Sequence, residues 1–136
     1  MTQFSISRRS ARGFSLIDVM ITVAIVGVLA TIALPSYQSS VRKSNRGAAQ
    51  SYLGDIAQRQ QQYLLDQRSY ASTEAALGLT TPSSVAPFYT IAIGIGAGPP
   101  PAFTASATPI GSQAGDLSGQ PLTLTNTGAK GPSGAW

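Results

Sequence analysis

A run of 21 residues, 14–34, contains a single charged side chain, Asp18, in an otherwise apolar stretch. As a helix rising about 1.5 Å per residue, it would extend roughly 30 Å, the thickness of a membrane's hydrocarbon layer. Apolar side chains surround the whole circumference, which is typical of a membrane-spanning helix and not of a helix lying on a core. The rest of the chain is too small to enclose such a helix. Residues 14–34 are therefore predicted to span a membrane.

The segment before this run, residues 1–13, is short and polar, and its only charges are three arginines. A cationic start followed by an apolar run also fits an ordinary secretory signal peptide. That alternative is disfavoured because the run is longer than a usual signal core and Asp18 interrupts it. In addition, Pro35 follows the best small-residue cleavage site, at Ala33.

Composition excludes several kinds of chemistry. The chain has no cysteine and no histidine, which removes disulfides, thiol nucleophiles, imidazole bases and the usual zinc ligands. Its formal charge of +4 depends on the arginines before Phe14, and beyond Ser69 the only base is Lys130. The C-terminal part therefore lacks the basic stripe expected of a nucleic-acid-binding head.

The period of the apolar residues becomes helical after Pro35. This proline removes one backbone hydrogen bond and is expected to kink the helix without ending it. Residues 35–68 are predicted to continue it as an amphipathic helix whose apolar face holds Ala49, Tyr52, Leu53, Ile56, Tyr63 and Leu64. A continuous helix over residues 14–68 would be about 80 Å long.

Residues 69–136 are predicted to form a loop and a sheet. The loop, 69–87, includes a short helical turn within 73–79, and the pattern then alternates between apolar and polar residues. Three strands are predicted, at 89–95, 103–108 and 122–125, each with one apolar face. The economical arrangement packs this face on the apolar stripe of the helix. The predicted class is α+β, with one long N-terminal helix packed on a small antiparallel β-sheet.

Asp18 is the most informative single residue. A charged side chain at the centre of a membrane helix costs about 2.5–3.5 kcal/mol by insertion scales, and less near its end. Such a carboxylate usually has a partner, although near the interface it can instead reach water. The physics of burial leaves both readings open.

A specific resemblance covers residues 12–37, which read RGFSLIDVMITVAIVGVLATIALPSY. This segment resembles the class III leader and N-terminal helix of type IV prepilins. The resemblance implies that a prepilin peptidase cuts between Gly13 and Phe14 and that Phe14 is then N-methylated. It also implies that Asp18, where the family usually has glutamate, pairs with the Phe14 amine of a neighbouring subunit. Gly27 and Pro35 lie where the family helix loosens in the filament.

The likeness continues more weakly to the C-terminus, where many PilE-like pilins carry a disulfide. Ser118 and Ala135 occupy the positions of its two cysteines, so the resemblance implies that this bridge is missing as a unit. A bridge of this kind typically contributes about 2–4 kcal/mol.

Several residues can be interpreted as structural as well as functional. Arg42, Lys43 and Arg46 are expected to be a solvated or lipid-headgroup face, with contact to an acidic neighbour or DNA as the alternative. Surface positions are expected for the scattered acids Asp55, Asp66, Glu74 and Asp116, which suggest neither a metal site nor an acid/base pair. A lone tryptophan, Trp136, is expected to complete a core, the alternative being an exposed adhesive aromatic.

The resemblance implies a structural subunit of a type IV pilus, with a PilE-like minor pilin favoured, and not an enzyme. The expected roles are pilus assembly, cell adhesion and twitching motility, without a cofactor or metal. The expected partners are other pilin subunits, the prepilin peptidase and methyltransferase, and the inner-membrane assembly machinery; nucleic acid is not favoured. Before assembly the subunit would sit in the inner membrane with its N-terminus in the cytoplasm, and afterwards in the extracellular pilus.

Three alternatives remain. A type II secretion pseudopilin commonly has a calcium site in the C-terminal domain, and no acidic cluster supports one here. A DNA-uptake (competence) pilin would need basic residues on its head. A single-pass membrane protein that never polymerises would keep an uncut N-terminus.

Overall fold

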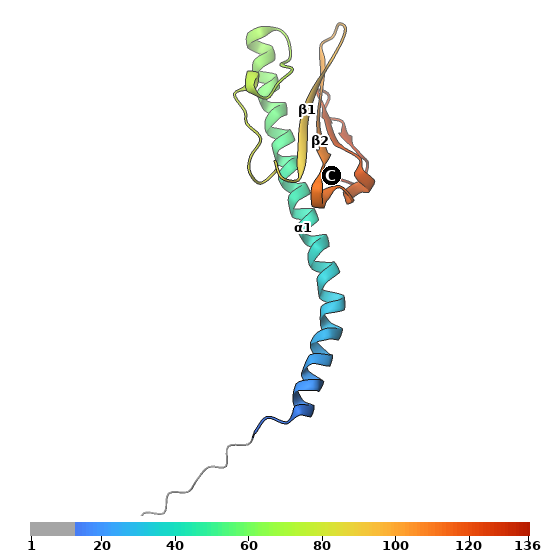
Figure 1. The fold of residues 1–136 in the computed structure, drawn as a ribbon. Helices are drawn as coiled ribbons and strands as arrows, with labels where there is room; N and C mark the ends of the chain where they lie inside the picture. The colour runs from blue at the N-terminus through green and yellow to red at the C-terminus, as the bar shows by residue number, and fades with distance from the viewer. Residues whose placement is uncertain (1–12) are drawn as a thin grey trace, which may run out of the picture. The chain divides into compact units, whose positions relative to one another are not determined.

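The computed structural model describes residues 13–136, so the greater part of the predicted leader, residues 1–12, lies outside the described residues. One helix, α1 (Leu16–Gln67), accounts for 52 residues and passes through Pro35 without ending (Figure 1). Arg68 follows it with a φ of 54°, the left-handed conformation that commonly terminates a helix. The long continuous helix expected from the sequence is confirmed.

The chain divides into two compact units, one reaching to Gln38 and the other comprising Ser39–Trp136. In the first unit nearly all side chains of α1 are exposed, and this part of α1 is long and apolar enough to cross a membrane. In the second unit, α1 buries one stripe of side chains, formed by Ala49, Tyr52, Leu53, Ile56 and Gln60. We call the second unit the head.

The sheet of the head is an antiparallel meander of four strands in the order β1-β2-β3-β4. Its strands are β1 (Tyr89–Gly96), β2 (Ala102–Pro109), β3 (Leu122–Thr125) and β4 (Lys130–Gly131). The first three confirm the predicted strands. The prediction of three strands missed β4, because a pair of residues between turns has no alternating pattern to detect.

Alternation along the strands explains which face is buried. On β2, Phe103, Ala105 and Ala107 are buried, while Thr104 and Thr108 between and beside them are exposed. The buried residues of β2 and β3 form one hydrophobic cluster with the apolar stripe of α1. The ring of Tyr70 packs edge-on against that of Phe103, with 4.9 Å between centroids.

The loop after α1 is held by short-range bonds and by α1 itself. It contains the predicted turn as a 3-10 helix, η1 (Ala75–Leu77), whose Leu77 is buried. Two further turns, η2 (Gly111–Gln113) and η3 (Asp116–Gly119), connect β2 to β3. In η3, Leu117 and Ser118 have backbone φ values of 50° and 57°, which residues other than glycine seldom adopt.

Candidate assembly surface

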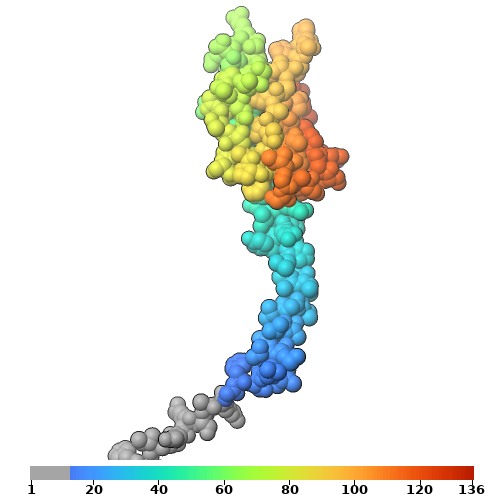
Figure 2. Space-filling model, viewed as in Figure 1, coloured from blue at the N-terminus to red at the C-terminus, as the bar shows by residue number. Residues whose placement is uncertain are grey.

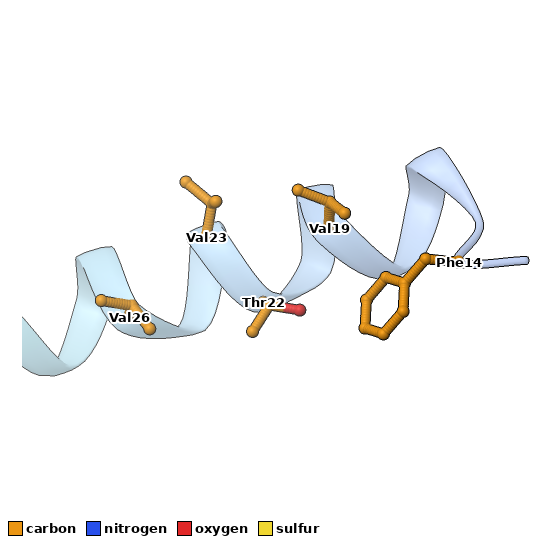
Figure 3. A pocket seen from close by; sticks show the side chains of 5 residues that line it. All are labelled: Phe14, Val19, Thr22, Val23 and Val26. Carbon is orange, nitrogen blue, oxygen red and sulfur yellow. The ribbon is translucent and has the colours of Figure 1, made fainter.

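The first turns of α1 present apolar side chains that no other part of their own unit covers. Phe14 is 84% exposed, and with Val19, Thr22, Val23 and Val26 it lines a shallow apolar hollow on the helix surface. Figure 3 shows four of these side chains along the start of α1 and Phe14 just before the helix begins. Exposed apolar area of this extent marks a surface that is covered by lipid or protein.

Asp18 lies in the first turn of α1, where the helix dipole favours a negative charge. Its Oδ2 accepts a hydrogen bond of 3.3 Å from the Ser15 backbone N–H, so the carboxylate also caps its own helix. Asp18 is exposed and has no basic side chain as an ion-pair partner among residues 13–136. Its carboxylate is therefore available to a group supplied from outside the chain.

The other residues singled out by the sequence lie on this same segment. Gly13 and Phe14 precede the helix, in a stretch without regular secondary structure. A Cβ built on Gly27 would meet nothing within 4 Å, so space within the chain does not require glycine there. Pro35 lies inside α1, which is continuous on both sides of it.

The head contains a buried polar cluster that the sequence did not reveal. Gln113 is 0% exposed, and its Nε2 donates to the Arg42 carbonyl (2.8 Å), the Tyr89 hydroxyl (3.1 Å) and the Asp116 carboxylate (3.2 Å). Arg46 pairs with Asp116 at 3.4 Å, and both side chains are largely buried. Burial foremost, and then the neighbouring Asp116, raise the pKa of Tyr89.

This cluster corrects two expectations. Asp116 is not a surface acid, because it accepts bonds from Arg46, Tyr89 and Gln113. Arg46 does not belong to a solvated basic face, because its guanidinium forms an ion pair with Asp116. The side chains of Arg42 and Lys43 are exposed, as expected. The effect of the cluster is to hold η2 and η3 against α1.

Two residues of α1, Tyr52 and Gln60, attach the loop 69–88 to the helix. The Tyr52 hydroxyl donates to the Glu74 carboxylate of the loop at 2.5 Å. Within the loop, the Thr81 hydroxyl donates to the same carboxylate at 2.9 Å. Glu74 is therefore half-buried, contrary to the surface position expected for it. Burial is the main cause, and the Glu74 carboxylate a further one, of a strong rise in the pKa of Tyr52.

Gln60 makes the second attachment. Fully buried, it accepts from the Ala71 N–H at 2.9 Å and donates to the Ala71 carbonyl at 2.6 Å. The Gln60 amide thus satisfies both backbone groups of Ala71, as a neighbouring strand would in a sheet. The sequence did not single out Gln60, because nothing in the local pattern distinguishes it from the exposed glutamines beside it.

Trp136 does not complete the core, which corrects the expectation for it. The residue is 36% exposed, its Nε1–H donates to the Gly131 carbonyl at 3.0 Å, and the Lys130 Nζ lies 4.7 Å from the ring centroid. The adjacent Ala135 is buried instead, and its carbonyl accepts a bond of 2.5 Å from Gln50. The tryptophan covers the short edge strand β4.

Within residues 13–136, no group of three histidine, cysteine, aspartate or glutamate side chains is close enough to hold a metal ion. Nor do the described acids pair with a base in the manner of a catalytic site; Asp116 and Glu74 are tied into the contacts described above. Among the described residues, the apolar side chains of α1 before Ser39 form a large surface without a partner.

Comparisons with known proteins agree with this arrangement. The family described as "Type IV minor pilin ComP, DNA uptake sequence receptor" matches residues 35–123, and the "Prokaryotic N-terminal methylation motif" matches residues 8–34. The structure is similar to that of a type IV pilin from Shewanella oneidensis, with a TM-score of 0.56 and 25% identity over 70% of this chain and 97% of that chain.

Curated relatives include both pilus and secretion proteins. The type IV wide pilus major component PilA4 of Thermus thermophilus is 37% identical over 81 residues, 57% of this chain and 62% of that protein. The fimbrial protein EcpC of Eikenella corrodens is 38% identical over 68 residues, 50% and 44% of the two chains. The type II secretion system core protein G of Pectobacterium carotovorum is 35% identical over 77 residues, 56% and 49%. The chain thus spans about half the length of these relatives.

A long N-terminal helix joined to a small antiparallel sheet is the architecture that this chain shares with the type IV pilin from Shewanella oneidensis. The chain belongs to the type IV pilin family, whose minor-pilin profile matches most of its length. The resemblance inferred from residues 12–37 is thereby confirmed.

Proposed function

We propose that this chain is a structural subunit of a type IV pilus, acting as a minor pilin in adhesion and twitching motility. The observation that carries the proposal is the exposed apolar surface of α1 before Ser39, with Asp18 in its first turn. A polymer of such helices buries this surface, and because every helix satisfies its own backbone hydrogen bonds, lipid and neighbouring helices are interchangeable surroundings.

Maturation would occur at the start of the helix. A prepilin peptidase would cut between Gly13 and Phe14, and the new Phe14 amine would be N-methylated. Both residues lie outside α1, so the scissile bond is free of helical hydrogen bonds. Before processing, the subunit would sit in the inner membrane with a cytoplasmic N-terminus, where the peptidase and assembly machinery reach it.

Asp18 would then pair with the Phe14 amine of a neighbouring subunit. Opposite charges in an apolar surrounding attract strongly, and pairing offsets the cost of holding either charge there. Such a pair would also define the axial register between subunits. Gly27 and Pro35 have low helix propensity, which would let α1 loosen between them when subunits pack into the extracellular filament.

The test is the intact mass and N-terminal sequence of the protein recovered from cells. The proposal expects a chain that begins at Phe14 and is heavier by one methyl group. A chain that begins at Met1 would contradict it and favour a non-polymerising membrane protein. A chain that begins near Leu34 would identify the apolar run as a secretory signal.

A DNA-uptake pilin is the second candidate, and the family description, which names a DNA uptake sequence receptor, favours it. Five exposed bases lie on the head: Arg42, Lys43, Arg59, Arg68 and Lys130. Contacts with phosphates weaken steeply as salt displaces them. A gel-shift assay at several salt concentrations therefore tests this role: salt-dependent binding supports DNA uptake, and no binding at low salt excludes it.

A pseudopilin role has weaker support. Relatives from type II secretion systems match about half of this chain, and the same half-length match is found with pilus proteins. Pseudopilins commonly have a calcium site, and residues 13–136 of this chain contain no group of acidic side chains that could form one. Rescue of a secretion-defective strain, and not of a piliation-defective strain, would favour this role.

A further inference from the structure

The outer edge of β1 is a row of unpaired backbone groups. The strand order places β1 at one side of the sheet, paired only with β2. The Ile110 N–H donates to the Phe88 carbonyl at 2.8 Å, and the Asn126 N–H to the Phe103 carbonyl at 3.1 Å. In an antiparallel ladder these two bonds place the even-numbered residues of β1 in the bonds to β2. The odd-numbered residues direct their N–H and C=O groups outward.

Three of these outward-facing residues are Ile91, Ile93 and Ile95. Their backbone groups have no hydrogen-bond partner within residues 13–136, whereas the Tyr89 N–H donates to the Val85 carbonyl at 2.9 Å. The outer edge of β1 is therefore hydrogen-bonded at Tyr89 and unpaired from Ile91 to Ile95. Figure 1 shows β1 at the rim of the sheet, beside the loop that follows α1.

This edge lacks the features that usually prevent strand addition. Proteins protect edge strands with charges, prolines or bulges. The eight residues of β1 include no charged residue and no proline, and they pair one-to-one with β2 without a bulge.

The side chains of the three isoleucines extend an apolar face along the edge. They lie opposite Phe103, Ala105 and Ala107 on the side of the sheet that faces α1. Ile91 and Ile93 are half-buried and Ile95 is 42% exposed. Figure 2 shows the end of the hairpin standing clear of the end of α1, so the far part of this apolar face is accessible.

We propose that this edge pairs with the same edge of a second copy of the chain, antiparallel and centred on Ile93. In that register Ile93 faces Ile93 of the other copy, and Ile91 faces Ile95. Every opposed pair then has both of its N–H and C=O groups directed at the partner, so all outward groups of the three isoleucines in both copies are satisfied.

The identity of the occupant follows from this self-complementarity. A two-fold contact requires that one patch match itself. Of the self-matching registers, the one centred on Ile93 pairs all three open isoleucines with one another, whereas a register centred on Ala92 would place Ile95 opposite Tyr89, whose N–H already bonds to Val85. No like charges meet across the contact, because β1 has none. The contact closes on itself, so it joins two heads side by side and cannot by itself propagate a filament. It depends only on the head, and it would stand if the proposed pilus role failed.

The absence of native cysteine allows a direct test of the register. On the exposed face of β1, Ala92 would lie opposite Gly94 of the other copy, with about 4.5 Å between Cα atoms, within the range that a disulfide bridges. Ala92 would lie roughly 8 Å from Ala92 of the other copy, beyond that range. A Cβ on Gly94 fits, because its nearest neighbour is the Thr104 carbonyl oxygen at 3.8 Å.

The experiment mixes full-length Ala92→Cys and Gly94→Cys chains in detergent micelles and oxidises them mildly. The mixed disulfide should exceed either like pair by at least about fivefold, because only the mixed pair has bridging geometry. Thr108→Cys, on the same exposed face but on β2, is the matched control and should not cross-link with either variant. Equal amounts of mixed and like pairs, no cross-linking, or equal cross-linking with the control would each overturn the proposal.

Discussion

The two halves of α1 are one continuous helix with opposite relations to the rest of the chain. Before Ser39 the helix is apolar on all sides and almost entirely exposed, while beyond it one stripe is buried by the sheet and loop of the head. The hydrophobic effect acts on both halves, but only the second finds its partner within the chain. The first half therefore depends on lipid or other subunits, and the second on the head's own packing.

The largest expected effect is on assembly by the first half. Asp18→Ala should nearly abolish incorporation into filaments while membrane insertion persists, because the neighbour's amine would be buried without a partner. Immunoblots of sheared filaments and of membranes would measure the two quantities.

Asp18→Asn is the matched control for this prediction. It keeps an oxygen that can accept the Ser15 N–H bond but removes the charge, so it should fail to assemble as Asp18→Ala does. Asp18→Glu should retain assembly. Normal incorporation of the alanine or asparagine variant would refute charge pairing.

The second effect concerns the packed half. Leu53 is 0% exposed, and Leu53→Ala should lower the free energy of unfolding of the head by about 2–5 kcal/mol, because it leaves a cavity. Leu65 is on the same helix but 83% exposed, so Leu65→Ala should lower the free energy of unfolding by less than about 0.5 kcal/mol. Denaturation of the full chain in detergent, followed by Trp136 fluorescence, would measure both. Equal losses would mean that the helix stripe does not stabilise the head.

A smaller effect is expected where α1 holds the loop. Gln60→Ala should cost about 1–3 kcal/mol, because the Ala71 N–H and carbonyl lose their buried partner. Amide hydrogen exchange should accelerate chiefly at residues 69–88. Gln62→Ala, an exposed position two residues further along, should leave exchange unchanged. Faster exchange throughout the head would instead show that Gln60 supports the whole core.

The smallest effect is a dependence on pH. The pKa of Tyr52 is raised in the folded head, so its contribution to stability is complete below the unfolded value, near pH 10. It is lost as the pH rises above that value toward the folded pKa. Tyr52→Phe should therefore reduce the loss of stability between about pH 9 and pH 11. The denaturation midpoint measures this, and an unchanged pH dependence in the variant would contradict it.

The sequence predicted those elements of the fold that have a periodic pattern of apolar residues. Tyr52, Leu53 and Ile56 recur at helical spacing and are buried as expected. The alternation of Phe103, Ala105 and Ala107 likewise placed β2 correctly. The resemblance identified Gly13, Phe14 and Asp18 as the processing and assembly residues, and those roles remain predictions.

The polar contacts could not be predicted in the same way. Gln113 and Arg46 are 67 positions apart in the chain, and both bind Asp116. Gln60 looks like its exposed neighbours until the loop carrying Ala71 returns to it. No local period distinguishes a glutamine that meets a distant backbone from one that meets water.

The sequence by itself determined that this chain has an apolar helix too long and too uniform for its own core, followed by an amphipathic helix and alternating strands. These are local properties, because burial on one side or on all sides is written in the spacing of apolar residues. Only the tertiary structure decided which polar groups are buried and which strand edge stays open. Those outcomes depend on the partners that distant segments bring, and a buried polar group is stable only where such a partner arrives.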